Sequence, residues 1–170
     1  RRLKFNNLTD AEIDLTNEKI QVCKKEIEKN DKKSEQLEKI KKRGNFHKKA
    51  DTLIQQKKYK EAIPFLDQAI KLRGAGIDYH WRGMCDYRLR NYKEAIPFFD
   101  KAIELRGDGI DYHWRGECDH KLKNYKEAIP FFDKEIEIGA TGFAYDWRAS
   151  CDYELGNFEE AIPFLDKTIE

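Results

Sequence analysis

All four prolines of the chain lie in copies of one motif, and this repetition is the feature that most constrains the fold. The motif reads YKEAIPFLDQAI at 59–70, YKEAIPFFDKAI at 92–103, YKEAIPFFDKEI at 125–136 and FEEAIPFLDKTI at 158–169. Each copy begins 33 residues after the previous one, and the segments between the copies also match, at 44–56, 77–89, 110–122 and 143–155. Self-similarity at a period of tens of residues is typical of a repeat array, in which each unit packs only against its neighbours.

We expect each unit to form two helices. The second helix carries an apolar stripe, because Tyr92, Ala95, Ile96, Phe99 and their equivalents recur at intervals of three and four. An Asn before this helix and a Glu three residues later form a capping-box pattern, at Asn91 with Glu94, Asn124 with Glu127 and Asn157 with Glu160. The first helix is expected to begin at a residue that favours N-caps: Asn45, Asp78 or Asp111. It also contains a small residue that lets its partner helix approach closely: Ala50, Gly83, Gly116 or Ala149. Each proline falls about two turns into the second helix, where we expect a bend.

These features resemble the tetratricopeptide repeat. The resemblance rests on the tyrosine before Ala-Ile, the FFDKAIEL run, the small residue of the first helix and the N-Y-x-E-A-I turn. It covers about residues 44–170 and implies an all-α fold, a right-handed α-solenoid with repeats at about 44–75, 76–108, 109–141 and 142–170. The period of 33 differs from the family's usual value of roughly 34. Gly74 and Gly107 lie where the family often has proline.

Residues 1–43 form a basic leader that we expect to be helical. A capping-box-like Thr9-Asp10-Ala11-Glu12 opens it, and Ile13, Ile20 and Ile27 follow at heptad spacing. The leader is expected either to cap the first repeat or to pair with another chain as a coiled coil, although Asn30, Ser34 and Lys41 interrupt the seam. The last unit reaches Glu170 inside its second helix, so we also expect the parent protein to continue.

Charge is distributed unevenly, although the formal net charge is only +1. Residues 1–60 hold 18 Lys/Arg and 10 Asp/Glu, whereas residues 61–170 hold 15 and 22, which argues against a nucleic-acid-binding surface on the repeats. The sequence has neither a signal-peptide pattern nor the run of about 20 apolar residues that crosses a bilayer. Cys85, Cys118 and Cys151 recur at the repeat spacing, on neighbouring helices about 8–10 Å apart, too far for a disulfide. We therefore expect buried thiols and a reducing, cytoplasmic compartment.

The first helices of tetratricopeptide arrays line a concave groove, so the resemblance implies which columns face a ligand. Most of these columns hold aromatic or imidazole side chains, and large aromatic residues dominate binding hot spots. The predicted groove residues are His47, His80, Trp81, Met84, Tyr87, His113, Trp114, Glu117, His120, Trp147 and Tyr153. The tryptophans are expected either to be exposed in the groove or to pack between neighbouring first helices. The family's clamp for the C-terminal carboxylates of chaperone tails uses Lys, Asn and Arg, and the matching columns here lack that set. A segment with apolar or aromatic side chains fits better.

A second recurring pattern pairs an arginine with an aspartate four residues later: Arg82/Asp86, Arg115/Asp119 and Arg148/Asp152. Within one helix this order is the weaker orientation, so we expect bridges from the Asp of one unit to the Arg of the next. A polar binding surface is the alternative.

We expect no catalytic site, metal or other cofactor in this chain. The spacings of His80, His113 and His120 follow from the repeat, and no Cys/His ligand set converges. The sequence therefore predicts a scaffold that binds a protein or peptide segment and is not an enzyme. The alternatives are a homo-oligomerisation module, acting through the N-terminal helix or the open C-terminal face, and a regulatory domain of a larger enzyme.

Overall fold

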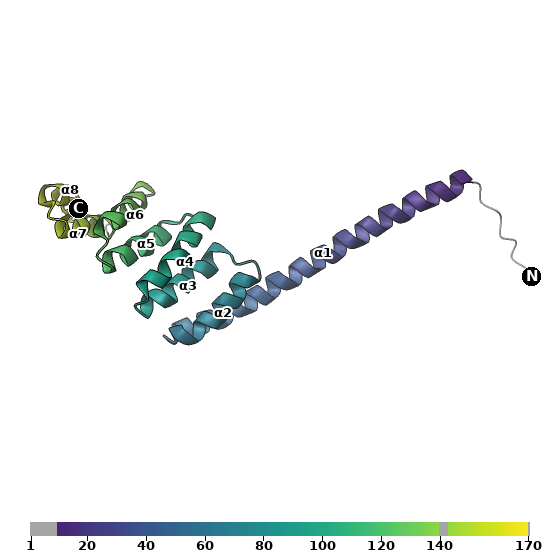
Figure 1. The fold of residues 1–170 in the computed structure, drawn as a ribbon, viewed down its shortest axis with the longest axis horizontal. Helices are drawn as coiled ribbons and strands as arrows, with labels where there is room; N and C mark the ends of the chain where they lie inside the picture. The colour runs from purple at the N-terminus through teal and green to yellow at the C-terminus, as the bar shows by residue number, and fades with distance from the viewer. Residues whose placement is uncertain (1–9, 140–142, 170) are drawn as a thin grey trace, which may run out of the picture. The chain divides into compact units, whose positions relative to one another are not determined.

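The computed structural model describes residues 10–139 and 143–169, which form helices and no strands (Figure 1). The helices are α1 (Asp10–Gln55), α2 (Tyr59–Lys71), α3 (Gly76–Arg88), α4 (Tyr92–Leu105), α5 (Gly109–Lys121), α6 (Tyr125–Glu137), α7 (Phe143–Glu154) and α8 (Phe158–Ile169). The chain divides into two compact units, Arg1–Lys41 and Lys42–Glu170. The all-α solenoid predicted from the repeats is confirmed.

The first unit consists of the leading part of α1. Its described side chains are exposed, including those of Leu15, Ile20, Val22, Ile27 and Leu37. Ion pairs one turn apart support it, such as Glu35 with Lys39, whose Oε1 and Nζ atoms are 2.6 Å apart. Thr9 and the side chain of Ile13 lie outside the described residues, and the capping and coiled-coil roles of the leader stay predictions. The helix start expected at Asn45 is wrong, since α1 runs through that position to Gln55.

The second unit begins with residues 42–55 of α1 and continues with α2 to α8. Each first helix from α3 onward packs on the second helix of its own repeat, as α3 does on α4, and on the second helix of the preceding repeat, as α3 does on α2. The first helices α3, α5 and α7 also contact one another in succession. The turn inside each repeat contains a residue with positive φ: Lys57 (59°), Arg90 (64°), Lys123 (64°) and Gly156 (80°). The next backbone N–H then donates to the first helix, from Asn91 to the Asp86 carbonyl at 2.9 Å. This turn folds the two helices back on each other.

Both kinds of expected helix cap differ from the structure. Asn91 and Asn124 are the N-cap residues of α4 and α6, but their side chains form no cap hydrogen bond. The Asn91 side chain instead hydrogen bonds to the Asp86 carboxylate. The first helices α3 and α5 begin at Gly76 and Gly109, so Asp78 and Asp111 lie in the first turn and are not N-caps. Their carboxylates are fully buried. The Asp78 carboxylate accepts the N–H of the N-cap residue Ala75 at 2.8 Å, and both carboxylates also bind a histidine of the preceding first helix.

The small residue of each first helix is matched in size to the residue beneath it. In the second and third repeats a Cβ added to Gly83 or Gly116 would lie 2.9 Å from the ring of Phe99 or Phe132. The first and fourth repeats have alanine at this column (Ala50 and Ala149) and leucine in place of phenylalanine (Leu66 and Leu165). Glycine thus makes room for the larger ring.

We predict that Gly116→Ala destabilises the protein but stabilises a Phe132→Leu variant. In the native background, overpacking costs about 1–3 kcal/mol, which exceeds the gain of about 1 kcal/mol from the better helix former. The leucine background recreates the Ala/Leu combination of the first and fourth repeats, so only the gain remains. Urea unfolding of the four proteins measures both effects. Stabilisation in both backgrounds would contradict the size match.

Candidate functional site

Buried histidine–carboxylate contacts join neighbouring first helices. His47 donates from Nδ1 to Oδ1 of Asp78 at 2.7 Å, and His80 donates in the same way to Asp111 at 2.6 Å. Both aspartates are fully buried, and each lies 31 residues after its histidine. Each pair therefore fixes one repeat against the next.

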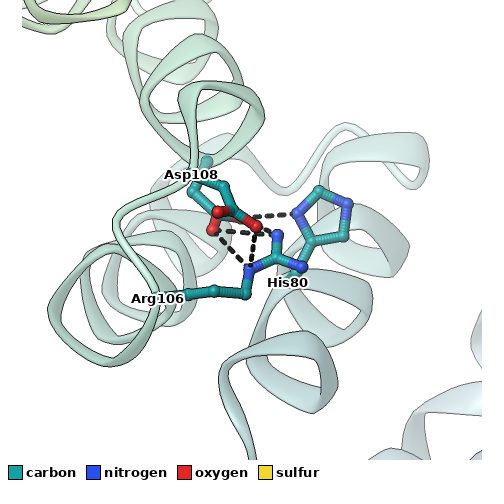
Figure 2. A network of polar contacts seen from close by, with 4 residues as sticks. His80, Arg106 and Asp108 are labelled. Carbon is teal, nitrogen blue, oxygen red and sulfur yellow. Dashed lines mark hydrogen bonds and ion pairs between the residues drawn. The ribbon is translucent and has the colours of Figure 1, made fainter. Parts of the chain in front are cut away.

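An arginine lies beside each of these aspartates. Nη1 of Arg43 lies 3.6 Å from Oδ2 of Asp78 as an ion pair. Arg106, the C-cap residue of α4, donates to the Asp111 carboxylate at 2.9 and 3.1 Å and pairs with Asp108 at 2.9 Å. Figure 2 shows the Arg106 guanidinium beside the His80 ring and Asp108. The buried carboxylate thus has a histidine on one side and an arginine on the other, as buried charges require.

The corresponding aspartate of the first repeat junction, Asp78, is kept ionised. Burial raises the pKa of Asp78. The hydrogen bonds from His47 and the Ala75 amide, together with the Arg43 charge, outweigh burial and hold that pKa below its ordinary value. The negative charge stays in place as a fixed acceptor for the histidine.

The third junction uses a different carboxylate. The column of Asp78 and Asp111 holds Ala144 in the fourth repeat. His113 donates instead from Nδ1 to Oε2 of Glu135 in α6 at 3.0 Å, and Glu135 is 6% exposed. Loss of the aspartate is accompanied by a new carboxylate at Glu135, in a column that holds alanine in the first two repeats (Ala69 and Ala102).

A second set of contacts lies about two helical turns further along the first helices, at Tyr87 and His120. The Tyr87 hydroxyl donates to Oε2 of Glu117, and His120 Nε2 lies 3.1 Å from Oγ of Ser150. Burial, followed by the hydrogen bond and charge of Glu117, raises the pKa of Tyr87. Burial, followed by the charge of Lys121, lowers the pKa of His120, whose buried Nδ1 has no hydrogen-bond partner.

The tryptophans connect adjacent repeats and remain partly exposed. Trp114 meets the Tyr87 ring edge-on with centroids 4.9 Å apart, and Trp147 meets His120 at 4.8 Å. A cation lies over each of these indoles, Arg88 at 5.6 Å from Trp114 and Lys121 at 5.1 Å from Trp147. The tryptophans therefore contribute both to packing between repeats and to the surface.

Other predicted groove residues lie at different depths. His80, Met84 and Glu117 are buried, with 6–7% of their surface exposed. Tyr153 is 62% exposed, whereas His47, Tyr87, His113 and His120 are partly buried. A binding role for these residues stays a prediction.

The groove residues predicted from the sequence do not include the apolar and charged residues that share a helix face with the tryptophans. Ile110 (46% exposed) and Phe143 (74% exposed) precede Trp114 and Trp147 by four residues, so each pair lies on one helix face. Seven residues after each tryptophan comes an exposed polar residue on the same face. We call this surface the tryptophan face: Ile77, Trp81 and Arg88 of α3, Ile110, Trp114 and Lys121 of α5, and Phe143, Trp147 and Glu154 of α7. The sequence signal that indicates this face is the recurrence of an apolar residue four positions before each tryptophan and a polar residue seven positions after it.

The arginine ladder differs from its predicted pairing. Arg82 binds Asp86 of its own helix, and its Nε donates at 2.8 Å to Asp67 in the second helix of the preceding repeat. Its guanidinium also lies 4.4 Å from the centroid of the Phe98 ring. Arg115 and Arg148 repeat this arrangement with Asp100 and Asp133. The predicted bridge between neighbouring repeats exists, but its predicted partner is wrong. Each arginine binds an aspartate of the preceding second helix, not the aspartate of the preceding first helix.

The three repeated thiols are free and buried, as predicted, and burial raises the pKa of Cys85, Cys118 and Cys151 to about 12. Within the described ranges, no group of His, Cys, Asp and Glu side chains could hold a metal ion. Among the described helices, none has the length and apolar character needed to span a membrane.

We predict that Asp111→Ala lowers the free energy of unfolding by about 3 kcal/mol, because it leaves the buried His80 and Arg106 without their shared acceptor. Adding Ala102→Glu should restore part of the loss, because it recreates the His113–Glu135 arrangement one repeat earlier. Urea unfolding measures both changes. Asp108→Ala, at a side chain 53% exposed, is the control and should cost less than about 0.5 kcal/mol. A double variant no more stable than Asp111→Ala would contradict the exchange of acceptors.

We predict that His120 makes stability depend on pH near neutrality. Because the folded-state pKa lies below 6.5, the unfolded chain binds the proton more tightly. The His120 contribution is therefore complete above the unfolded-state pKa and declines as the pH falls through it. His120→Tyr, which places the side chain of Tyr87 and Tyr153 in this column, should flatten the pH dependence of the urea midpoint between about pH 7.5 and 5.5. An unchanged slope in this variant would assign the titration to another group.

Comparisons with known proteins agree with this fold. The model of the family described as anaphase-promoting complex, cyclosome, subunit 3 matches residues 55–135, and no curated protein matches the chain. The MamA 41-end structure from Desulfovibrio magneticus RS-1 has a TM-score of 0.71 at 20% identity, covering 75% of this chain and 74% of that one.

Two further solved structures are described as tetratricopeptide proteins. YrrB, "a TPR protein with an unusual peptide-binding site", has a TM-score of 0.68 at 23% identity over 73% of this chain and 66% of its own. The OM64 TPR domain from Arabidopsis has a TM-score of 0.63 at 22% identity over 66% of this chain and 96% of its own. The repeated sequence, the helix pairs and these likenesses together show that the repeats have the all-α helix-pair fold of tetratricopeptide-repeat structures.

Proposed function

We propose that the array is an interaction scaffold that binds a peptide or protein segment across the tryptophan face. The observation that carries this proposal is the pair of exposed apolar residues, Ile110 and Phe143, each four residues before a partly exposed tryptophan. Large apolar side chains exposed next to one another on a folded surface mark an interaction site. Trp and Arg are also the residues most enriched among binding hot spots. YrrB, whose fold is similar, is described as having a peptide-binding site.

The chemistry of this face defines the ligand. Ile110 and Phe143 offer apolar contact area, which suits leucine, isoleucine or aromatic side chains of a bound segment. Arg88 and Lys121 already lie over the indoles of Trp114 and Trp147 and add positive charge beside them. We therefore propose a ligand segment with apolar or aromatic anchors flanked by acidic residues. Cytoplasmic localisation belongs to the same proposal, because three buried free thiols suit a reducing compartment.

We predict that a phage-displayed library of random peptides yields binders rich in apolar and aromatic residues. The three tryptophans are the only ones in the chain, so their fluorescence reports binding of the selected peptides directly.

Ile110→Glu should weaken binding at least about tenfold, because it places a charge among apolar contacts and repels acidic flanks. It should leave the circular-dichroism spectrum and the urea midpoint nearly unchanged, because Ile110 is exposed.

Ile138→Glu is the matched control. Ile138 is 48% exposed, close to the value for Ile110, but follows α6 and lies outside the tryptophan face. Equal weakening by the two substitutions would place the peptide elsewhere. A library that yields no binder to the folded protein would contradict the proposed function.

A further inference from the structure

The turns inside the first three repeats are basic, and the turn inside the fourth is acidic. Residues 55–61, 88–94 and 121–127 each hold three Lys/Arg and one Glu, a balance of +2. Residues 154–160 hold three Glu and no Lys/Arg, a balance of −3. Because the repeats stack in the same orientation, equivalent turns follow one another along one edge of the array. The charge of this edge therefore changes sign between the third and fourth repeats.

We call the cations of this edge the basic ridge: Lys57, Lys58 and Lys60, then Arg88, Arg90 and Lys93, then Lys121, Lys123 and Lys126. All nine residues are exposed, and none forms an ion pair with another described residue. In contrast, Arg82 and Arg115, on the same first helices as Arg88 and Lys121, are each paired with two aspartates. The ridge thus carries charge that the fold does not neutralise.

Three of these cations lie where the backbone favours glycine. Lys57, Arg90 and Lys123 have φ of 59°, 64° and 64°, in the left-handed region that glycine adopts without strain. The fourth repeat has Gly156 at the same position, with φ of 80°. The turn therefore folds with glycine, and the first three repeats carry a cation there despite the backbone strain. A cation at a strained and exposed position indicates a role in binding rather than in folding.

The ridge is continuous with the tryptophan face. Arg88 and Lys121 belong to both surfaces, because each lies over an indole and also begins a basic turn. First helices pack about 8–10 Å apart, so successive turns recur at about this distance. A polyproline II segment rises about 3.1 Å per residue with about three residues per turn, so every third side chain points the same way roughly 9 Å further on. Carboxylates at every third residue of such a segment therefore match the three basic turns.

We propose that the ligand of the tryptophan face also carries an acidic segment, with a carboxylate at every third residue, that binds along the basic ridge. This inference rests on the proposed function and extends the binding site to the edge of the array. The acidic segment lies over the first three repeats, because Glu154, Glu159 and Glu160 repel it at the fourth turn. A protein segment fits better than RNA, because cations already lie over the indoles of Trp114 and Trp147 on which bases would stack.

Peptides with defined tails test the inference on the full chain. The probe is a library-selected peptide joined through a short Gly-Ser linker to the tail Glu-Pro-Pro-Glu-Pro-Pro-Glu, placed at either terminus, and the matched probe has Gln in place of each Glu. At low ionic strength, we predict that the glutamate tail at one terminus strengthens binding about tenfold over the glutamine tail, because it adds three carboxylate contacts with exposed cations. Added salt should reduce this gain.

Lys93→Glu combined with Lys126→Glu should abolish the gain and leave binding of the glutamine-tailed peptide unchanged. The two substitutions place Glu where the fourth repeat has Glu159, in the first turn of a helix, where the helix dipole favours a negative charge. Lys101→Glu combined with Lys134→Glu is the matched control. It makes the same change in net charge about two turns further along the same helices, away from the ridge, and should preserve the gain.

Arg90→Gly combined with Lys123→Gly separates binding from folding. We predict a higher urea midpoint, because glycine relieves the strain at positive φ, together with a smaller gain from the glutamate tail.

A glutamate tail that gives no gain overturns the inference, and so does a gain that Lys93→Glu with Lys126→Glu preserves. In both cases, binding of the untailed peptide would still support the proposed function. If no library peptide binds, the inference and the proposed function both fail. Binding of polyuridylate or of phosphatidylserine vesicles that the same double variant abolishes, without any gain from the glutamate tail, would assign the ridge to phosphate ligands and also overturn the inference.

Discussion

The buried contact between a histidine and a carboxylate is the interaction on which the rest of the array depends. Asp78 and Asp111 carry carboxyl groups without exposed surface, and each is stable there only because donors from the preceding repeat reach it. Removing one partner of such a buried pair costs about 3–5 kcal/mol, a large share of the stability of a small domain. The contact also sets the register of successive first helices. That register brings Trp114 against Tyr87 and aligns the exposed residues into one face.

The repeats are similar but not interchangeable, because their differences come in matched pairs. Glycine accompanies phenylalanine and alanine accompanies leucine where the two helices of a repeat cross. Asp111 with Ala102 is exchanged for Ala144 with Glu135 at the next junction. Tyr87 meets Glu117, whereas His120 meets Ser150. The two repeats that meet at each junction are thus complementary to each other. Pairing either of them with a different repeat would leave buried polar groups without partners, so the matched pairs specify a single order of stacking.

The proposed binding surface depends on the same framework. The tryptophan face is formed by the first helices, and the contacts of Trp114 with Tyr87 and of Trp147 with His120 cross the junctions between repeats. The face combines apolar area with charge, because Arg88 and Lys121 lie over the indoles of Trp114 and Trp147.

The sequence by itself determined the repeat, the helix pairs, the all-α solenoid and the buried thiols, because a strict 33-residue period with apolar residues every three or four positions fits only stacked helix pairs. The helix caps predicted from local sequence patterns differ from the structure where a polar side chain also has a partner outside its own helix. Asp78 caps α3 from inside its first turn, where one oxygen accepts the Ala75 amide while the other binds His47 of the preceding first helix, and the Asn91 amide binds the Asp86 carboxylate. The partner of Arg82, the depth of Met84 and Glu117, and the exposure of Ile110 and Phe143 were decided by the stacking of neighbouring repeats. Burial and pairing across a junction depend on how far one helix is displaced and rotated against the next, and the period does not encode that geometry.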